Sequence, residues 1–333
     1  MIFVTGATGF LGHNLIPHLL QAGHSVRALV RPTSDTTFLQ EQGIELAVVD
    51  DISNADAIQQ AMAGCDQVVH AAGLFRFWGD PSDFWQTNVA GTTAVLQAAI
   101  SHQIKRFIHI STIVVVGKTS PGTAITEETL CLPQEPYQMT KREGEQLALA
   151  AAADHDLPVI ILRPGAFYGP WGRYAFNRLF FEEPLRGWRI KVDHGRHITF
   201  PAFVPDVVQA IELALVNGRA GHIYNICSQS LSHNEANAII SDLAGIPHWR
   251  LHMPTFLVMN LARAWTAVSR FTHREPFYPI NMAPYVFQDW QVSAAKAEKE
   301  LGFRPTPFDQ GAQKTLEWYW HEGILRPKNV KRK

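Results

Sequence analysis

Short apolar, β-branched runs alternate with longer segments of helical periodicity through the first half of the chain. The runs predict strands at residues 2–5, 25–30, 44–50, 66–72, 105–112 and 157–164. Strand–helix alternation of this length indicates parallel strands that are joined by right-handed crossovers. The pattern therefore predicts an α/β fold with a doubly wound parallel sheet.

The pattern changes after Pro164, where Trp, Phe, Pro and Arg become frequent and the alternation is lost. We expect a first domain at 1–165 and a smaller, mostly substrate-binding part at 166–333. Within that part, a helix at 204–215 and a strand at 222–228 are predicted to return to the sheet. The apolar segment 255–271 is interrupted by Asn260, Arg263 and Arg270, which predicts a buried or pocket-lining helix. The basic tail at 326–333 is expected to be a solvated end.

Composition narrows the class of protein. The formal net charge of −1 gives no electrostatic reason to bind nucleic acid. No apolar run reaches the ~18 residues of a membrane span, so none is expected. Cys65, Cys131 and Cys227 are scattered, which indicates neither a zinc site nor a disulfide framework. With a first strand that starts near Ile2 and leaves no room for a signal peptide, a cytoplasmic location is expected. The histidine-rich HGRH and HWRLH segments lack a metal-binding pattern, so we expect no metal.

A glycine-rich segment, TGATGFLG, connects the first strand to the first helix. Glycine permits a tight turn and a close approach of the backbone to a pyrophosphate, and a helix N-terminus favours negative charge. The motif follows a strand and opens a helix, which is the context that Rossmann-type dinucleotide binding requires. We therefore expect cofactor contacts from this segment, at Gly6, Thr8, Gly9, Phe10, Leu11 and Gly12.

The ends of later strands extend this predicted cofactor site. Arg31 ends the second strand, where an acidic residue would bind the ribose of NAD, and a guanidinium suits a 2′-phosphate. NADP(H) is therefore the preferred cofactor, with NAD(H) as the alternative. Asp51 and Ile52 end the third strand. The Asp51 carboxylate can accept a hydrogen bond from the adenine amino group. The small residues Ala71, Ala72 and Gly73 end the fourth and allow the backbone to approach the cofactor.

A tyrosine and a lysine form the candidate catalytic pair. Tyr137 and Lys141 are four residues apart, so they share one face of a helix. A free phenol has a pKa of ~10, and a neighbouring ammonium is expected to lower it. Thr112 ends the fifth strand, and its hydroxyl can bind a substrate oxygen opposite Tyr137. Together with the glycine loop, these residues predict hydride transfer with a nicotinamide cofactor.

With these motifs in place, the chain resembles the extended short-chain dehydrogenase/reductase superfamily, also named NAD-dependent epimerase/dehydratase. The segments TGATGFLG, HAAG, NVAGT, YQMTK and LRPGAFYGP carry the resemblance. Within this superfamily, the chain is similar to the 3β-hydroxysteroid dehydrogenase, dihydroflavonol 4-reductase and hopanoid-associated epimerase-like branches. The resemblance implies Thr112 as the catalytic hydroxyl, Tyr137 as acid/base and Lys141 as the ribose-binding, tyrosine-activating residue. It also implies that Asn88 lies near the cofactor and that Pro164 flanks the nicotinamide.

Departures from the superfamily pattern narrow the chemistry. Dehydratases carry Asp-Glu after the catalytic threonine, where this chain has Ile113 and Val114. Epimerases of nucleotide sugars usually carry an arginine at the position of Thr199. Arg173, Arg178, Arg189 and Arg196 are alternatives for binding a diphosphate. Aromatic residues are abundant near the expected nicotinamide and favour an apolar substrate, at Phe75, Trp78, Phe167, Tyr168 and Trp171.

Three functions stay open from the sequence. The first is an NAD(P)-dependent oxidoreductase that interconverts a secondary alcohol and a ketone, or an aldehyde, on a hydrophobic small molecule. The second is a sugar or nucleotide-sugar epimerase. The third, a non-catalytic cofactor-sensing module, is disfavoured because Tyr137 and Lys141 are both present. A small-molecule substrate is expected in each enzyme, and a homodimer is left open.

Overall fold

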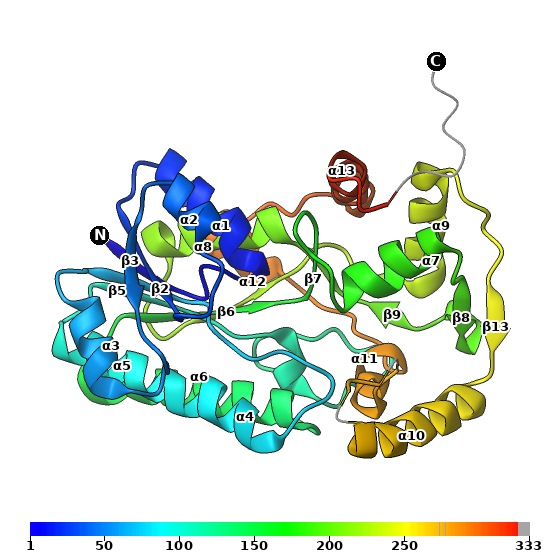
Figure 1. Ribbon diagram of the computed structural model, residues 1–333, viewed down its shortest axis with the longest axis horizontal. Helices are drawn as coiled ribbons and strands as arrows, with labels where there is room; N and C mark the ends of the chain where they lie inside the picture. The colour runs from blue at the N-terminus through cyan, green and yellow to red at the C-terminus, as the bar shows by residue number, and fades with distance from the viewer. Residues whose placement is uncertain (273, 277, 326–333) are drawn as a thin grey trace.

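The computed structural model describes residues 1–272, 274–276 and 278–325, so the basic tail at 326–333 lies outside the described residues. A seven-stranded sheet forms its centre (Figure 1). In spatial order the strands are β3 (Glu45–Val48), β2 (Val26–Val30), β1 (Ile2–Thr5), β4 (Gln67–His70), β5 (Arg106–Ile110), β6 (Val159–Pro164) and β11 (Ile223–Ile226). Every neighbouring pair is parallel, which confirms the predicted doubly wound α/β fold.

Helices cover both faces of the sheet because the strands are apolar on both sides. One face packs against α1 (Phe10–Gln21), α2 (Thr37–Glu41), α8 (Val204–Asn217) and α12 (Ala295–Leu301). The other packs against α3 (Ala55–Met62), α5 (Gly91–Ser101) and α6 (Pro136–His155). The short helix α4 (Pro81–Trp85) and the π-helix η1 (Gln86–Ala90) lead into α5. The predicted returning segment thus supplies α8 and β11 to these layers.

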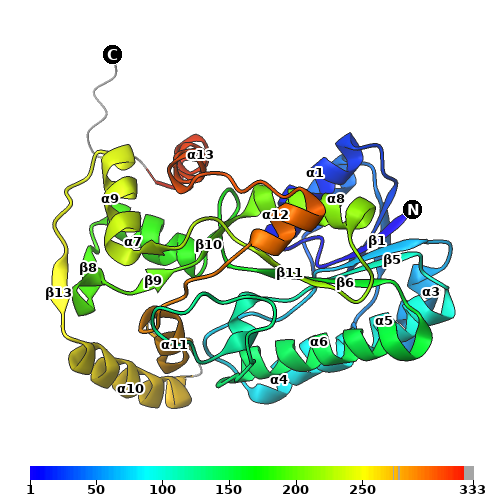
Figure 2. The same ribbon diagram turned by 180° about the vertical axis from the view of Figure 1, so that it is seen from behind.

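The remaining elements lie beside the sheet, at the end of the molecule away from the N-terminus (Figure 2). An aromatic core that includes Tyr168, Phe181, Phe203 and Phe308 holds several of them together. Three two-stranded pairs accompany the helices. The elements are η2 (Ile113–Val116), β7 (Ala166–Tyr168), η3 (Asn177–Glu182), α7 (Glu183–Arg186), β8 (Ile190–Val192), η4 (Asp193–Gly195), β9 (Ile198–Thr199), β10 (Pro201–Phe203), β12 (Leu231–Ser232), α9 (His233–Ala244), β13 (Leu251–Met253), α10 (Thr255–Thr272), η5 (Ile280–Met282), α11 (Ala283–Val286) and α13 (Phe308–His321).

The helix α10 differs from its prediction. A buried or pocket-lining helix was expected at 255–271, and this expectation is wrong. Among the side chains of this helix that the structure describes, only Val258, Ala262 and Ser269 are buried, and they form a narrow strip. Large apolar residues outside this strip, such as Leu261 and Phe271, are exposed. Among the described helices, α10 included, none is long and apolar enough to cross a membrane.

Buried charge anchors the helix α6 to the sheet. Glu145 on α6 accepts two hydrogen bonds from the Arg163 guanidinium on β6, at 2.7 and 2.8 Å, and both side chains are buried. Arg142 adds a third bond to the same carboxylate at 2.9 Å. A bidentate pair fixes distance and orientation together. The pair therefore sets how α6, with Tyr137 and Lys141, lies against the strands.

Removing one member of this pair is expected to destabilise the fold strongly. Glu145→Leu leaves the Arg163 guanidinium buried without its carboxylate, which lowers the free energy of unfolding by about 3–5 kcal/mol. The double variant Glu145→Leu, Arg163→Met should recover most of this loss, because no charge is then left unpaired. Urea unfolding of the three proteins measures both effects.

The ion pair between Arg27 and Glu45 is the matched control. Its N–O distance is 2.8 Å, but its carboxylate is half-exposed. Glu45→Leu should change the free energy of unfolding by about 1 kcal/mol or less. Equal losses for Glu45→Leu and Glu145→Leu would contradict the anchoring role.

Candidate active site

A large cavity of about 1310 Å³ lies at the carboxyl ends of the strands. It extends from the glycine loop after β1 to the strand β8 in the second part of the chain. Ligands of open α/β sheets bind at this edge. Most residues predicted for the site line the cavity: Gly6, Thr8, Gly9, Phe10, Leu11, Arg31, Asp51, Ile52, Ala71, Ala72, Gly73, Phe75, Thr112, Tyr137, Lys141, Pro164, Phe167 and Trp171.

The glycine loop fits a dinucleotide pyrophosphate. Gly6 has a φ of +75°, and a Cβ there would lie 2.8 Å from the Ala71 backbone, so only glycine is accommodated. Gly9 precedes α1, and no side chain caps the first turn of this helix. The backbone N–H groups of that turn are therefore available to an anion. Gly12 does not line the cavity. Because it has no side-chain carbon, α1 packs directly on the backbone of Ala7.

A buried polar chain below the glycine loop was not predicted from the sequence. Thr5 Oγ1 accepts from the Ala72 N–H at 3.0 Å and lies 2.8 Å from Nδ1 of His70. Burial lowers the His70 pKa to about 3, so the ring is neutral. Its Nε2 lies 3.0 Å from the hydroxyl of Thr92, which donates to the Asn88 carbonyl. This series of hydrogen-bonded side chains thus links the turns after β1 and β4 to the helix behind them.

Asn88 occupies a different position from the one expected. Its side chain lies behind the cavity wall, where Oδ1 accepts from the Leu74 N–H at 2.7 Å. Its Nδ2 donates to the Leu74 carbonyl and to the Thr140 hydroxyl, both at 3.1 Å. The amide therefore connects the loop after β4 to α6. Asn88 positions the loop on which Gly73 lies instead of facing the cavity itself.

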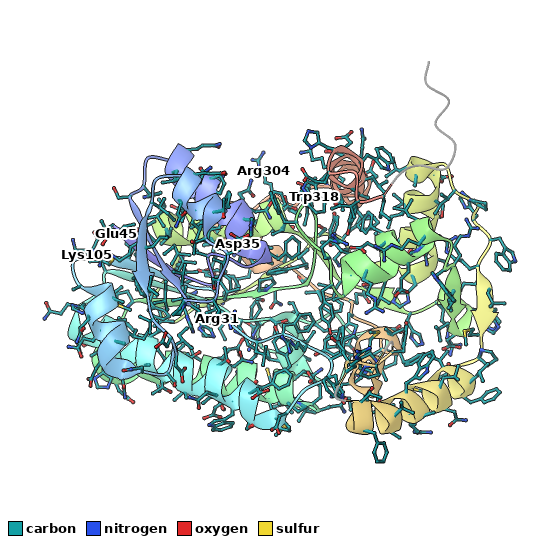
Figure 3. All side chains as sticks on the ribbon, in the orientation of Figure 1. Arg31, Asp35, Glu45, Lys105, Arg304 and Trp318 are labelled. Atoms are coloured by element: carbon teal, nitrogen blue, oxygen red, sulfur yellow. The ribbon has the colours of Figure 1, made fainter. Side chains whose placement is uncertain are left out.

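Arg31 and Asp51 lie at the cofactor end of the cavity. Arg31 follows β2 directly and is exposed (Figure 3). Asp51 follows β3, and its carboxylate accepts from the Ser53 N–H at 2.9 Å and from Gln86 at 3.1 Å. These bonds, the Ser53 bond foremost, lower the pKa of Asp51. Asp51 is therefore an oriented anion and Arg31 a cation at the same end.

Tyr137 lies at the centre of the cavity, in the first turn of α6. It shares a hydrogen bond with the Thr112 hydroxyl, so the structure brings these two predicted residues together. Glu135 begins α6, and its carboxylate accepts from the N–H groups of Tyr137 and Gln138, both at 2.9 Å. It also accepts from the Tyr285 hydroxyl at 2.6 Å. The carboxylate cap thus fixes the first turn of the helix.

The expectation that a lysine lowers the Tyr137 pKa is not met. Burial raises this pKa above its ordinary value, and the neighbouring Glu135 carboxylate raises it further. The hydrogen bond with Thr112 acts in the opposite direction but is the weakest of the three causes. The physical reason is that removal from water disfavours the phenolate. Tyr137 therefore keeps its proton at neutral pH.

Lys141 lies one helical turn after Tyr137, and its ammonium is buried. Nζ donates to the Ile110 carbonyl at the end of β5, at 2.6 Å. Burial lowers the Lys141 pKa to about 8, against the opposing influence of the Glu145 carboxylate. This cation is thus held at the carboxyl end of the sheet and titrates close to neutrality.

Aromatic rings surround Tyr137 on the side away from the glycine loop. The ring centroids of Phe75 and Tyr137 are 4.7 Å apart. The ring centroid of Phe77 lies 5.5 Å from that of Tyr174 and 5.1 Å from that of Tyr285. Phe77, Tyr174 and Tyr285 line the cavity but were not predicted. The alternation of Phe75 and Phe77 could have indicated Phe77. Tyr174 and Tyr285 come from distant segments and carry no comparable signal.

Two predicted substrate residues lie outside the cavity, and a third lines a different part of it than expected. Tyr168 is fully buried in the aromatic core, because alternation along β7 directs Phe167 to the cavity and Tyr168 to the other side. Trp78 follows the inward-facing Phe77 and does not line the cavity. Trp171 lines the cavity but stacks on His13 of α1, with ring centroids 4.5 Å apart. It therefore belongs to the glycine-loop end.

A parallel doubly wound sheet, a glycine loop that opens a helix, and a half-buried tyrosine one helical turn before a buried lysine define a nicotinamide-dependent enzyme of the extended short-chain dehydrogenase/reductase type. The chain belongs to the NAD dependent epimerase/dehydratase family, which its residues 2–227 match. Enzymes of this family bind a nicotinamide adenine dinucleotide. The family contains reductases, dehydratases and epimerases, so membership alone leaves the reaction open.

Full-length relatives illustrate this range. The chain is 29% identical to sterol demethylase protein B of Methylococcus capsulatus, over 97% of this chain and 99% of the relative. It is 29% identical to 4-hydroxy-2-methyl-3-oxo-4-farnesyl-3,4-dihydroquinoline-1-oxide ketoreductase of Stigmatella aurantiaca, over 90% and 91%. Among solved structures, the dTDP-glucose 4,6-dehydratase DesIV of Streptomyces venezuelae, with NAD and DAU bound, superposes with a TM-score of 0.78. That match has 25% identity and covers 98% and 99% of the two chains.

Lys141 predicts a pH dependence of cofactor affinity. If its ammonium binds the cofactor ribose, the contact is complete below the Lys141 pKa and is lost as the pH rises through about 8. Titration of the protein with NADPH between pH 6 and 9.5, followed by fluorescence, should show weakening affinity above pH 8. Lys141→Met should bind more weakly than wild type below pH 8, approach the wild-type affinity above it, and lack this dependence. An identical pH profile in both proteins would exclude the ribose contact.

Proposed function

We propose that the protein is an NAD(P)-dependent oxidoreductase that interconverts a secondary alcohol and a ketone, or an aldehyde, on a hydrophobic small molecule. The apolar wall of the cavity beyond Tyr137 carries this proposal. Phe75, Phe77, Leu179, Met282 and Tyr285 line that region. Such a wall stabilises an aliphatic or aromatic ring system by removing its surface from water.

The residues after Thr112 disfavour the dehydratase alternative. Ile113 and Val114 occupy the positions at which dehydratases carry Asp-Glu, and both are buried. Neither side chain can transfer a proton, so elimination of water has no acid or base at these positions. Thr199 occupies the position of the usual diphosphate-binding arginine. Its side chain is neutral and cannot supply the charge that a nucleotide sugar needs.

The alternative arginines do not replace that charge. Arg178, Arg189 and Arg196 do not line the cavity. Arg173 does line it, but its Nε donates to the Glu182 carboxylate at 2.6 Å. A diphosphate would compete with that carboxylate for the guanidinium. This arrangement supports the hydrophobic substrate over a nucleotide sugar.

Two relatives support the same substrate class. The Stigmatella aurantiaca enzyme is named as a ketoreductase of a farnesylated ring system, and the Methylococcus capsulatus protein carries sterol in its name. Both match nearly the whole of this chain. The DesIV dehydratase has the same fold and acts on a nucleotide sugar by its name, so it supports the cofactor more than the substrate.

The geometry supports a role for each residue that we propose as catalytic. Thr112 and Tyr137, joined by a hydrogen bond, face one point of the cavity, where both hydroxyls can bind a carbonyl oxygen. Because its raised pKa keeps Tyr137 protonated, the phenol can donate its proton as the carbonyl becomes an alcohol. Lys141 binds the ribose and holds positive charge near the developing oxyanion. When bound, the nicotinamide supplies or accepts the hydride at the carbon.

Tyr137→Phe is expected to abolish turnover of a ketone panel while cofactor affinity stays within a few-fold of wild type. The proton donor is lost but the ring still fills its space, and loss of general acid catalysis costs roughly 10²–10⁴-fold in rate. Steady-state NADPH oxidation and a binding titration measure the two effects. Turnover near the wild-type rate would remove Tyr137 from the chemistry.

We also propose a preference for NADP(H) over NAD(H), with Arg31 as the discriminating residue. A charge-assisted bond to a 2′-phosphate contributes ~1.5–3 kcal/mol, which corresponds to roughly a tenfold to hundredfold preference. Arg31→Ala should remove this preference and leave NADH affinity nearly unchanged. Titration of both proteins with NADPH and NADH tests it. Equal affinities in the wild type, or an unchanged preference in Arg31→Ala, would refute the assignment.

A further inference from the structure

One side of the helix α10 is apolar and exposed. Leu257, Leu261, Ala264, Val268 and Phe271 recur at spacings of four and three residues, so they follow one line along the helix. We name these five residues the α10 stripe. All are exposed, Val268 by 56% and Phe271 by 87%. A contiguous apolar surface of this kind marks a site that another molecule covers.

The charge around the α10 stripe restricts what can cover it. No aspartate or glutamate occurs between Asp242 and Glu275, whereas Arg250, Arg263, Arg270 and Arg274 all lie in this segment. Arg263 and Arg274 are exposed. Glu275, which ends the segment, accepts a hydrogen bond from Tyr174. The segment thus combines apolar surface with excess positive charge.

This combination fits an anionic lipid surface better than a second copy of the chain. An interfacial helix inserts its apolar side among the acyl chains while arginines bind the lipid headgroups. Two copies that met through the α10 stripe would place arginines of one segment beside those of the other, with no carboxylate within the segment to pair with them. Like charges in such contact oppose association.

The cavity opens toward the same end of the molecule. Trp188 lines the cavity and is 61% exposed, so the cavity reaches the surface beside β8. β8 pairs with β13, and α10 begins two residues after β13. β13 itself carries the exposed Leu251, and Trp249 before it is also exposed. Figures 1 and 2 show β8, β13 and α10 along one end, away from the N-terminus.

We propose that α10 docks the protein on an anionic membrane surface and that the cavity takes its substrate from the bilayer through the opening beside β8. The second half of this proposal rests on the proposed function, because it identifies the hydrophobic substrate as a membrane-resident alcohol or ketone. The first half concerns binding alone. The cofactor end, with Arg31, lies at the far end of the cavity and stays open to water.

Flotation of the full chain with lipid vesicles tests the docking without any substrate. Vesicles that contain phosphatidylglycerol should capture the wild type, and pure phosphatidylcholine vesicles should capture much less. Leu261→Asp, Val268→Asp adds two negative charges to the α10 stripe and should reduce capture by about tenfold or more. Val216→Asp on α8 is the matched control, because Val216 is 67% exposed outside the segment, and it should float like the wild type.

Turnover separates the two halves of the proposal. The double variant should reduce a short water-soluble ketone at the wild-type rate, which also shows that it is folded, but should lose activity toward a ketone embedded in vesicles. Absence of capture, or equal capture of all variants, would overturn the docking. If the wild type forms a dimer without lipid and the double variant is a monomer, the docking on membranes is overturned in favour of self-association. Failure of Tyr137→Phe to reduce turnover would refute the proposed function and leave the vesicle result unaffected.

Discussion

The position of α6 depends on the buried ion pair between Glu145 and Arg163. The pair joins this helix to β6, and Lys141 joins it to the end of β5 through the Ile110 carbonyl. At the N-terminal end of the helix, the Glu135 carboxylate caps the first turn. Charges that are buried without partners are strongly unfavourable, so each contact allows only a narrow range of helix positions. The catalytic geometry follows from that constraint.

Burial acts in opposite directions on the pKa values of the two groups that we propose as catalytic. Removal from water raises the pKa of the Tyr137 phenol and lowers that of the Lys141 ammonium, so each is driven toward its neutral form. A protonated phenol beside the Thr112 hydroxyl suits proton donation to a carbonyl oxygen. The apolar rings around Phe75 and Phe77 extend this dry environment toward the substrate. The proposed binding of a hydrophobic molecule and the proposed acid catalysis thus depend on one physical property of the cavity.

The sequence predicts the sheet, and it predicts most residues that line the glycine-loop end of the cavity, because both depend on local signals. Strand periodicity, the glycine spacing and the Tyr137–Lys141 pair each involve residues that are close along the chain. The substrate end is predicted less well, because Tyr174 and Tyr285 reach the cavity from separate segments. The prediction of Tyr168 as a substrate residue is wrong, because an aromatic residue in a short strand can face either the core or the cavity. The segment 255–271 was expected to be buried, and only the structure shows how little of α10 is covered.

The fate of the hydride distinguishes the proposed reaction from its alternatives. An oxidoreductase transfers the hydride to its product and releases the oxidised cofactor, whereas an epimerase returns the hydride to the same substrate. Turnover of a hydrophobic ketone with NADPH in which both hydrogens at C4 of the nicotinamide are deuterium should give one deuterium on the product carbinol carbon for each cofactor consumed. Retained nicotinamide, with interconversion of a nucleotide sugar and no net cofactor consumption, would contradict the account.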